Sequence, residues 1–237
     1  MSNLEDRIAS IHERIDDACR RVGRDAASVR LVAVSKTVDE TVIAETIRLG
    51  LSHFGENRVQ DATRKFNILH AAGDSPRLHL IGQLQTNKAR AAAKIAHEIE
   101  SVDRLNLIET LETEARKLAE QDQLVAGIRL PVLLQVNVAG EEQKSGCSPE
   151  ESPGLVEAIL ASPTLELRGL MTIAPLVPLK EDARPTFTAL RELRDDLVGR
   201  YPEARLDTLS MGMTNDFEVA IEEGSTSIRV GRAIFAP

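Results

Sequence analysis

The stretch Leu31-Val-Ala-Val-Ser-Lys36 decides the fold, because it is a short apolar run with a lysine at its end. A run of this kind predicts a buried strand. An unpaired ammonium group is costly to bury, so the lysine needs a partner anion, a route to solvent or a covalent electrophile. On position alone, a strand-end lysine that extends to solvent is the more common case.

Strand-like and helix-like segments alternate along the whole chain. The predicted strands are residues 31–35, 53–55, 78–82, 98–102, 132–138, 167–173, 208–211 and 227–230. The predicted helices are residues 3–22, 38–49, 59–69, 87–96, 105–120, 155–160, 186–199 and 217–222. Such alternation implies parallel pairing through right-handed crossovers. The sequence therefore predicts an α/β fold, a single (β/α)8 TIM barrel over residues 1–237. The extra N-terminal helix should cover the bottom of the barrel or pack on its side.

Side-chain alternation within the strands predicts which residues face the barrel interior. If Lys36 points inward, Leu31, Ala33 and Ser35 face the helices. The other strands give the same outward set: Leu134, Val136, Val138, Leu209, Met211, Ile228 and Val230. The same alternation places these side chains inside: Val32, Val34, Gln135, Asn137, Ser210 and Arg229. Polar side chains should therefore converge near the carboxyl ends of the strands, which is where barrel active sites lie.

Two segments near the C-terminus contain residue types that hold a phosphate: Ser210-Met-Gly-Met-Thr-Asn-Asp216 and Ser227-Ile-Arg-Val-Gly-Arg232. Gly212 and Gly231 would let the backbone approach an anion closely, and Ser210 offers a hydroxyl donor. The loops after the seventh and eighth strands of such barrels are a frequent phosphate site. The alternative is two glycine turns that serve only tight connections. A lysine together with a phosphate site indicates pyridoxal 5′-phosphate as the cofactor, held by Lys36 as a Schiff base.

Arg229 and Asn57 are further candidates for cofactor binding. An inward arginine beside a pyridine nitrogen would keep that nitrogen unprotonated, which makes the ring a weaker electron sink. A structural salt bridge to a carboxylate is the alternative for Arg229. The Asn57 amide would bond the ring oxygen of the cofactor or cap the next helix. Polar residues 83–88 and 141–147 would form the rim, although ordinary loop polarity is the simpler explanation.

Composition excludes several classes of protein. The net charge of −8 argues against nonspecific nucleic-acid binding and against an anionic membrane surface. No apolar stretch approaches the length that spans a bilayer, and the first residues lack the layout of a signal peptide. Cys19 and Cys147 lie far apart, and the histidines show no metal-ligand spacing. We therefore predict a cytoplasmic protein without a disulfide or a metal site.

An ordered set of motifs resembles the pyridoxal-phosphate homeostasis protein family from about residue 5 to the C-terminus. The motifs are Val-Ser-Lys36, His53-Phe-Gly-Glu-Asn57, His79-Leu-Ile-Gly82, Leu84-Gln-Thr-Asn-Lys88, Lys144-Ser-Gly146, Arg168-Gly-Leu-Met171, Ser210-Met-Gly-Met213 and Arg229-Val-Gly-Arg-Ala-Ile-Phe235. The resemblance implies a fold-type III barrel, similar to the N-terminal domain of alanine racemase. It also implies that Lys36 binds the cofactor covalently, that Arg229 faces the pyridine nitrogen, and that Ser210 with the Gly231 region holds the phosphate. The chain departs from many relatives at Thr214, where they have serine, and at its end, Ala236-Pro237.

The resemblance implies a protein that binds, buffers and delivers pyridoxal phosphate and so maintains vitamin B6 and amino-acid homeostasis, with no established catalytic reaction. Apo forms of pyridoxal-phosphate enzymes would be its further partners, and a monomer or a weak dimer is expected. The alternative is a racemase that acts on a small amino acid and needs a second acid or base. Tyr201 comes just before the seventh strand, at the far end of the barrel. A third hypothesis is that the barrel binds another phosphorylated metabolite noncovalently.

Overall fold

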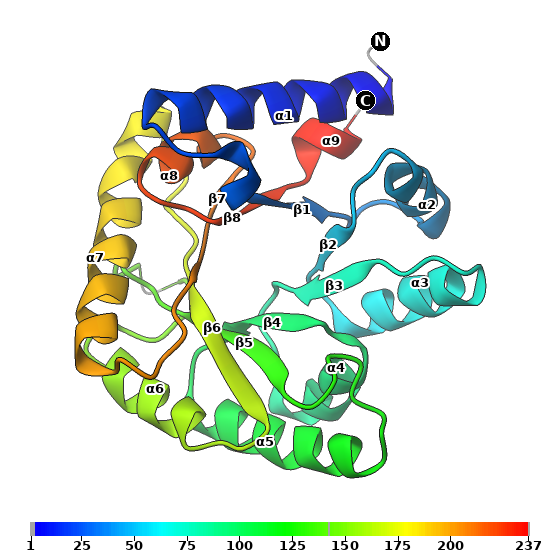
Figure 1. Ribbon diagram of the computed structural model, residues 1–237, viewed down its shortest axis with the longest axis vertical. Helices are drawn as coiled ribbons and strands as arrows, with labels where there is room; N and C mark the ends of the chain where they lie inside the picture. Colours follow the sequence, from blue (N-terminus) through cyan, green and yellow to red (C-terminus); the bar gives the residue numbers. More distant parts are fainter. Residues whose placement is uncertain (1–2, 142, 237) are drawn as a thin grey trace.

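The computed structural model describes residues 3–141 and 143–236, and within them eight parallel strands pair in chain order and close into a barrel (Figure 1). The strands are β1 (Arg30–Val34), β2 (His53–Glu56), β3 (Arg77–Leu80), β4 (Glu98–Val102), β5 (Leu130–Gln135), β6 (Leu165–Met171), β7 (Thr208–Met213) and β8 (Ser227–Val230). The last strand pairs with the first, in a register that sets Arg30 opposite Ser227. The predicted (β/α)8 barrel is confirmed.

Helices connect successive strands and surround the barrel. The α-helices are α1 (Leu4–Arg21), α2 (Glu40–Arg48), α3 (Val59–Ala71), α4 (Ala89–Ile95), α5 (Leu105–Glu120), α6 (Ser152–Leu160), α7 (Arg184–Arg200), α8 (Phe217–Glu222) and α9 (Arg232–Phe235). Short 3-10 helices are η1 (Ala26–Ser28), η2 (Thr86–Lys88) and η3 (Lys180–Ala183). Among the described residues, no helix has the length and apolar character that crossing a membrane requires.

The predicted alternation of side chains within the strands is confirmed. Six strand residues that were expected to face the helices lie in the hydrophobic core that the strands and helices share: Leu31, Ala33, Leu209, Met211, Ile228 and Val230. The residues between them, such as Ser210 and Arg229, are buried without belonging to that core. Two layers result, an apolar one between sheet and helices and a polar one inside the barrel.

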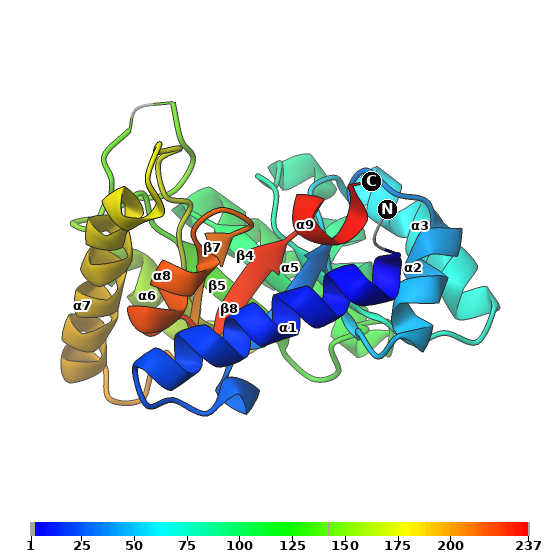
Figure 2. The same ribbon diagram turned by 90° about the horizontal axis from the view of Figure 1, so that it is seen from above.

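The extra N-terminal helix packs on the side of the barrel, along α8 and α9 (Figures 1 and 2). It begins with a capping box, in which Asn3 and Asp6 each accept a hydrogen bond from the backbone N–H of the other. Its apolar stripe buries Ile8, Ile11 and Ile15. Both ends of the described chain consequently lie beside each other.

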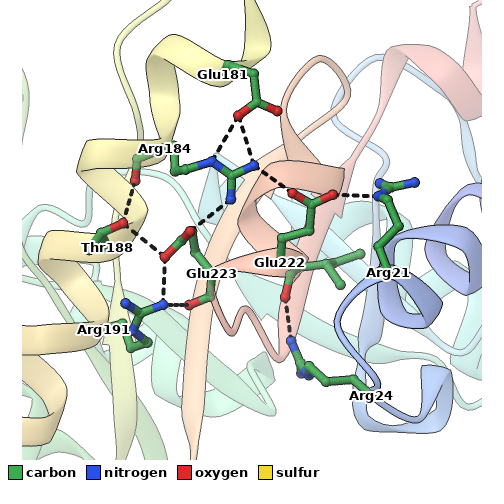
Figure 3. A network of polar contacts seen from close by, with 9 residues as sticks. Arg21, Arg24, Glu181, Arg184, Thr188, Arg191, Glu222 and Glu223 are labelled. Carbon is green, nitrogen blue, oxygen red and sulfur yellow. Dashed lines mark hydrogen bonds and ion pairs between the residues drawn. The ribbon is translucent and has the colours of Figure 1, made fainter.

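A network of ion pairs fixes α8 between α1 and α7 (Figure 3). Arg184 on α7 donates to Glu222 at 2.6 Å and to Glu223 at 2.8 Å. Arg191, also on α7, donates to Glu223 at 2.6 Å, and from the other side Arg21 of α1 donates to Glu222 at 2.6 Å. The loop after β7 is held separately by α1, because Arg14 donates to the carbonyl oxygen of Thr214 at 3.3 Å.

Candidate functional site

Lys36 and Asn57 lie side by side at the carboxyl ends of two neighbouring strands. The register of β1 and β2 pairs Val34 with Gly55, so Lys36 and Asn57 each come two residues after a paired position. Both side chains are exposed. This end of the barrel therefore presents an amine that is accessible to a ligand.

Gly231, which follows β8, is packed against the end of β1. Arg229 pairs in register with Val32, and a Cβ at Gly231 would lie 3.2 Å from both the Cβ and the carbonyl oxygen of Val34. A larger residue would thus push the β8 loop away from the strand that precedes Lys36. Closure of the barrel brings the Gly231 loop to the same edge as Lys36 and Asn57.

Gly212, near the end of β7, has a backbone conformation that favours glycine. Its φ of +95° is in the left-handed region, and a Cβ there would lie 2.6 Å from the Cβ of Ala220 and 2.9 Å from the Cα of Phe217. The end of β7 consequently lies directly against α8. Packing within the protein thus requires both Gly212 and Gly231, which lie near the carboxyl ends of neighbouring strands, at the edge that carries Lys36. Their expected contact with a phosphate stays a prediction.

Arg229 lies inside the barrel below these loops, and only 4% of its surface is exposed. Its guanidinium donates to the Ser210 hydroxyl at 2.5 Å and to the carbonyl oxygen of Thr172 at 2.7 Å. A carboxylate oxygen of Glu100 is 4.0 Å away. Burial lowers the pKa of Arg229, while Glu100 and Asp216 act in the opposite direction. The carboxylate partner that the sequence left as an alternative is therefore present.

Ser210 is fully buried, and its hydroxyl proton is already engaged. The hydroxyl donates to Glu100 at 2.5 Å and accepts from Arg229. A serine has one O–H to donate. To donate to a phosphate, this hydroxyl would have to leave Glu100, so the expected contact of Ser210 with phosphate stays a prediction.

Asn57 does not occupy the capping position of the next helix, because α3 begins at Val59 with Arg58 as its N-cap residue. Instead, the backbone of Asn57 packs against the loop after β3. A Cβ at Gly82 would lie 2.4 Å from the carbonyl oxygen of Asn57. That close approach fixes the backbone of Asn57 and leaves its side chain exposed on the rim.

The rim after β5 is held by contacts within the protein. Lys144 donates to the carbonyl oxygen of Ile173 at 3.4 Å and pairs with Glu141. The Asn137 amide donates to the Glu141 carbonyl oxygen at 2.8 Å.

Burial raises the pKa of the Cys147 thiol to about 12, so this cysteine is a poor nucleophile. Residue 142 of the predicted rim segment 141–147 lies outside the described residues.

The sequence interpretation missed a set of charged residues inside the barrel. His79 of β3 lies 2.9 Å from Glu100 and 3.1 Å from Glu98, both on β4. The signal was available, because His79 alternates with Leu78 and Leu80 just as the two glutamates flank Ile99. Side-chain alternation alone places all three inside the barrel.

The ligand atoms of His79, Glu98 and Glu100 come within 4.8 Å of one another, an arrangement that suits a metal ion. Cationic groups already compete for these carboxylates. Arg30 donates to Glu98 at 3.2 Å, and Arg229 lies 4.0 Å from Glu100. Two guanidinium groups oppose a further cation, so the cluster fits an internal ion-pair network better than a metal centre.

A second missed residue is Lys65 on α3, a buried lysine beneath the turn that carries Lys36. Its ammonium group donates to Glu56 at 2.9 Å and to the carbonyl oxygen of Ser35 at 2.8 Å. The sequence signal was a lysine on the apolar stripe formed by Ala62 and Leu69.

Comparison with known proteins places the chain in a family. Residues 8–237 match the model of the alanine racemase N-terminal domain. The chain is 43% identical to the pyridoxal phosphate homeostasis protein of Aquifex aeolicus over 98% of this chain and 97% of that protein. It is 44% identical to the one from Pseudomonas aeruginosa, over 99% and 96% of the two chains. The chain belongs to the pyridoxal phosphate homeostasis protein family.

Solved structures agree with this assignment. The structure of PipY from Synechococcus elongatus with PLP bound has a TM-score of 0.84 and 33% identity to this chain, over 99% of this chain and all of that one. An alanine racemase from Corynebacterium glutamicum has a TM-score of 0.67 and 15% identity, over 96% of this chain and 60% of that one. At that identity the likeness to the racemase shows a shared fold alone.

Proposed function

We propose that this protein holds pyridoxal 5′-phosphate covalently through Lys36, as a Schiff base, and by holding and releasing it maintains vitamin B6 and amino-acid homeostasis. One observation carries the proposal. An exposed lysine and a buried arginine, Lys36 and Arg229, lie on neighbouring strands at the carboxyl end of the barrel, in a chain whose relative PipY was solved with PLP bound.

Pyridoxal phosphate, when bound, supplies an aldehyde that reacts with amines and a ring that withdraws electrons. Lys36 provides the amine, on a turn that leaves it open to solvent. Asn57 beside it offers an amide to the polar edge of the ring. The close backbone approaches at Gly212 and Gly231 would surround the phosphate with main-chain N–H groups.

Arg229 favours storage over turnover. A guanidinium group keeps its proton at neutral pH, so a ring nitrogen that faces it stays unprotonated. Electron withdrawal by the ring is then weaker than when a carboxylate faces the nitrogen. A buried Arg229 held by Ser210, Thr172 and Glu100 cannot easily turn away from this position.

The racemase alternative requires a second acid or base near Lys36. Tyr201 does not supply one, because it ends α7 and its hydroxyl donates to Glu157 on α6 at 2.7 Å. That position precedes β7, at the opposite end of the strand from Gly212. We therefore favour the homeostasis function.

The visible absorption spectrum of the purified protein, loaded with pyridoxal phosphate and then freed of unbound cofactor by gel filtration, tests this proposal. The wild type should gain a visible band, and Lys36→Ala should lack it while keeping its circular dichroism spectrum. Lys144→Ala, which removes a rim lysine, is the matched control and should keep the band. A noncovalent site for another phosphorylated metabolite would give no band in any of the three proteins.

Turnover is tested separately. The loaded protein is incubated with a panel of amino acids, and chiral and keto-acid products are followed. We expect no product beyond the background of free cofactor. Rapid racemisation or transamination would make the protein an enzyme.

We further propose that apo forms of pyridoxal-phosphate enzymes receive the cofactor and that the protein is a monomer or a weak dimer. Mixing the loaded protein with such an apoenzyme should restore that enzyme's activity faster than the rate at which the cofactor leaves the protein on its own. Sedimentation velocity over a range of concentrations measures the assembly state.

A further inference from the structure

A chain of polar contacts crosses the barrel interior and ends at Arg229. It starts in a pocket of about 550 Å³ at the amino ends of the strands, lined by Arg30, His53 and Arg168 among others. The ring nitrogens His53 Nδ1 and His79 Nε2 are 2.8 Å apart. The other ring nitrogen of His79 is 2.9 Å from Glu100.

The second half of the chain runs from Glu100 to the guanidinium. The other carboxylate oxygen of Glu100 accepts from the Ser210 hydroxyl at 2.5 Å, and that hydroxyl accepts from Arg229 at 2.5 Å. Solvent has little access, because the exposed fractions are 2% for His79, 0% for Glu100 and 4% for Arg229. Hydrogen bonds in so dry an environment are strong and costly to break.

Two carboxylates favour the protonated form of His79. Its Nδ1 lies 2.9 Å from Glu100 and 3.1 Å from Glu98. Burial opposes a charge on the ring, but the hydrogen bonds that His79 donates to Glu100 and Glu98 outweigh burial and raise the pKa of His79.

We propose that His79 and Glu100 are positioning residues for Arg229. A protonated His79 holds the Glu100 carboxylate, Glu100 turns the Ser210 hydroxyl so that its lone pair faces Arg229, and the guanidinium is thereby fixed toward the ring of the cofactor. The part that concerns the cofactor rests on the proposed function, whereas the part that concerns His79 and Glu100 is a property of the protein alone.

The direction of each hydrogen bond supports this assignment. Burial and the neighbouring cationic groups lower the pKa of His53 to about 3, so this ring is neutral and its Nδ1 is free to accept from His79 Nε2. His79 Nδ1 then donates to Glu100, which requires both ring nitrogens of His79 to hold protons. Glu100 accepts at both oxygens, and Ser210 has no orientation left except the one that faces Arg229.

His53 lines the pocket at the amino ends of the strands, so protons reach His79 from that end of the barrel. The groups that act on His79 come from several elements: Arg30, His53, His97, Glu98, Glu100 and Arg229. As the pH rises through the raised pKa of His79, the imidazolium is lost and its hold on Glu100 weakens. The position of Arg229 should then depend on pH, although Arg229 itself does not titrate in this range.

The first test uses the cofactor-free protein and nitrogen-15 NMR of its histidine rings, with the His79 signal assigned by its loss in His79→Gln. We expect a His79 titration midpoint above the ordinary value of 6.5. In Glu100→Gln the midpoint should fall by about one pH unit or more, because the main counter-charge is gone. A midpoint that does not change in Glu100→Gln, or a His79 that is neutral at pH 6, would overturn the proposal.

The second test uses the loaded protein and reads the absorption and fluorescence of the bound cofactor against pH. His79→Gln and Glu100→Gln should shift the cofactor spectrum, flatten its pH dependence and release the cofactor about tenfold faster, as expected for one charged hydrogen bond lost. The control is His97→Gln. The His97 ring accepts from the Leu78 N–H at 3.1 Å outside the chain of contacts, and burial lowers its pKa to about 4, so the substitution removes no charge near His79 at neutral pH. This variant should match the wild type.

The outcomes distinguish a failure of the proposed function from a failure of the positioning role of His79 and Glu100. If the wild type itself forms no adduct at Lys36, the proposed function fails and the NMR result still decides the roles of His79 and Glu100. If the adduct forms but all variants share the wild-type spectrum, pH profile and release rate, the positioning role is wrong. Should Glu100→Gln not fold, Ser210→Ala, which removes one hydroxyl from the same chain of contacts, replaces it in the second test, and the wild-type His79 midpoint alone decides the first.

Discussion

The Lys65 ammonium group lies 2.8 Å from the main-chain carbonyl oxygen of Ser35, the residue just before Lys36. Lys65 is 4% exposed and pairs with Glu56, which is 1% exposed. The Ser35 hydroxyl also donates to Glu56, at 2.7 Å. One buried ion pair therefore fixes the backbone from which the proposed cofactor lysine extends.

Lys65→Met should lower the free energy of unfolding by about 3–5 kcal/mol, because it leaves the Glu56 carboxylate buried without a cation. Urea denaturation measures this loss. Lys94→Met, which changes an exposed lysine on α4, is the control and should stay within about 0.5 kcal/mol of the wild type.

The double variant Lys65→Met with Glu56→Gln should recover a large part of the stability, because the remaining buried groups are then neutral. It should nevertheless react with pyridoxal phosphate more slowly than the wild type, since Ser35 has lost its bond from α3. A Lys65→Met protein as stable as Lys94→Met would refute the structural role of this pair.

Gly212→Ala should destabilise the protein by about 1–3 kcal/mol and weaken its retention of pyridoxal phosphate. The new methyl group would lie 2.6 Å from the Cβ of Ala220, in a backbone conformation that alanine rarely adopts. Thermal unfolding and equilibrium dialysis measure the two effects.

Gly199→Ala is the matched control for this substitution. Gly199 is an exposed residue of α7, and a Cβ there would meet no atom within 4 Å. The free energy of unfolding of this variant should rise by about 0.5–1 kcal/mol, because alanine is more stable in a helix than glycine is. If both variants behaved alike, the close approach at Gly212 would not matter.

Much of the fold was predictable because strand residues alternate strictly between two environments. Because Lys36 and Arg229 were expected to point into the barrel, alternation placed Leu31 and Ile228 in the layer that faces the helices. The structure has both residues there. The predicted helix 38–49 is present as α2, and Asp39 caps it by accepting from the backbone N–H groups of Thr41 and Val42.

The missed part of the site depends on contacts between residues far apart in the chain. Ser210 donates to Glu100, 110 positions away, and no local pattern shows that pairing. The histidines were searched for spacing along the sequence, whereas His79 meets Glu98 through the register of β3 and β4. Lys65 was not singled out as a buried residue, although it falls on the buried side of α3.

Acidification should lower the stability of the protein, because it protonates the carboxylates that are paired at α8. Burial raises the pKa of both Glu222 and Glu223, but hydrogen bonds, first among them those from Arg184, lower it below the ordinary value of 4.5. A carboxylate with a lowered pKa in the folded state stabilises the fold above its unfolded pKa. That stabilisation is lost as the pH falls through the folded pKa.

Arg184→Met should therefore lower the free energy of unfolding by about 1–2 kcal/mol at pH 7. Below pH 5, the free energy of unfolding of this variant should depend less on pH than that of the wild type. Urea denaturation at a series of pH values measures both. Arg200→Met, which removes an exposed pair with Asp196, is the control and should follow the wild-type profile. Parallel profiles for Arg184→Met and the wild type would show that the α8 pairs do not cause the acid sensitivity.

Reductive trapping locates the covalent bond between the protein and the cofactor. The protein is loaded with pyridoxal phosphate, reduced with borohydride, digested with trypsin and mapped by mass spectrometry. Because trypsin does not cut at a modified lysine, the account predicts one adduct, on the uncut peptide of residues 31–48, and its loss in Lys36→Ala. An adduct on Lys65 or Lys144 in place of Lys36, or no adduct at all, would contradict the account.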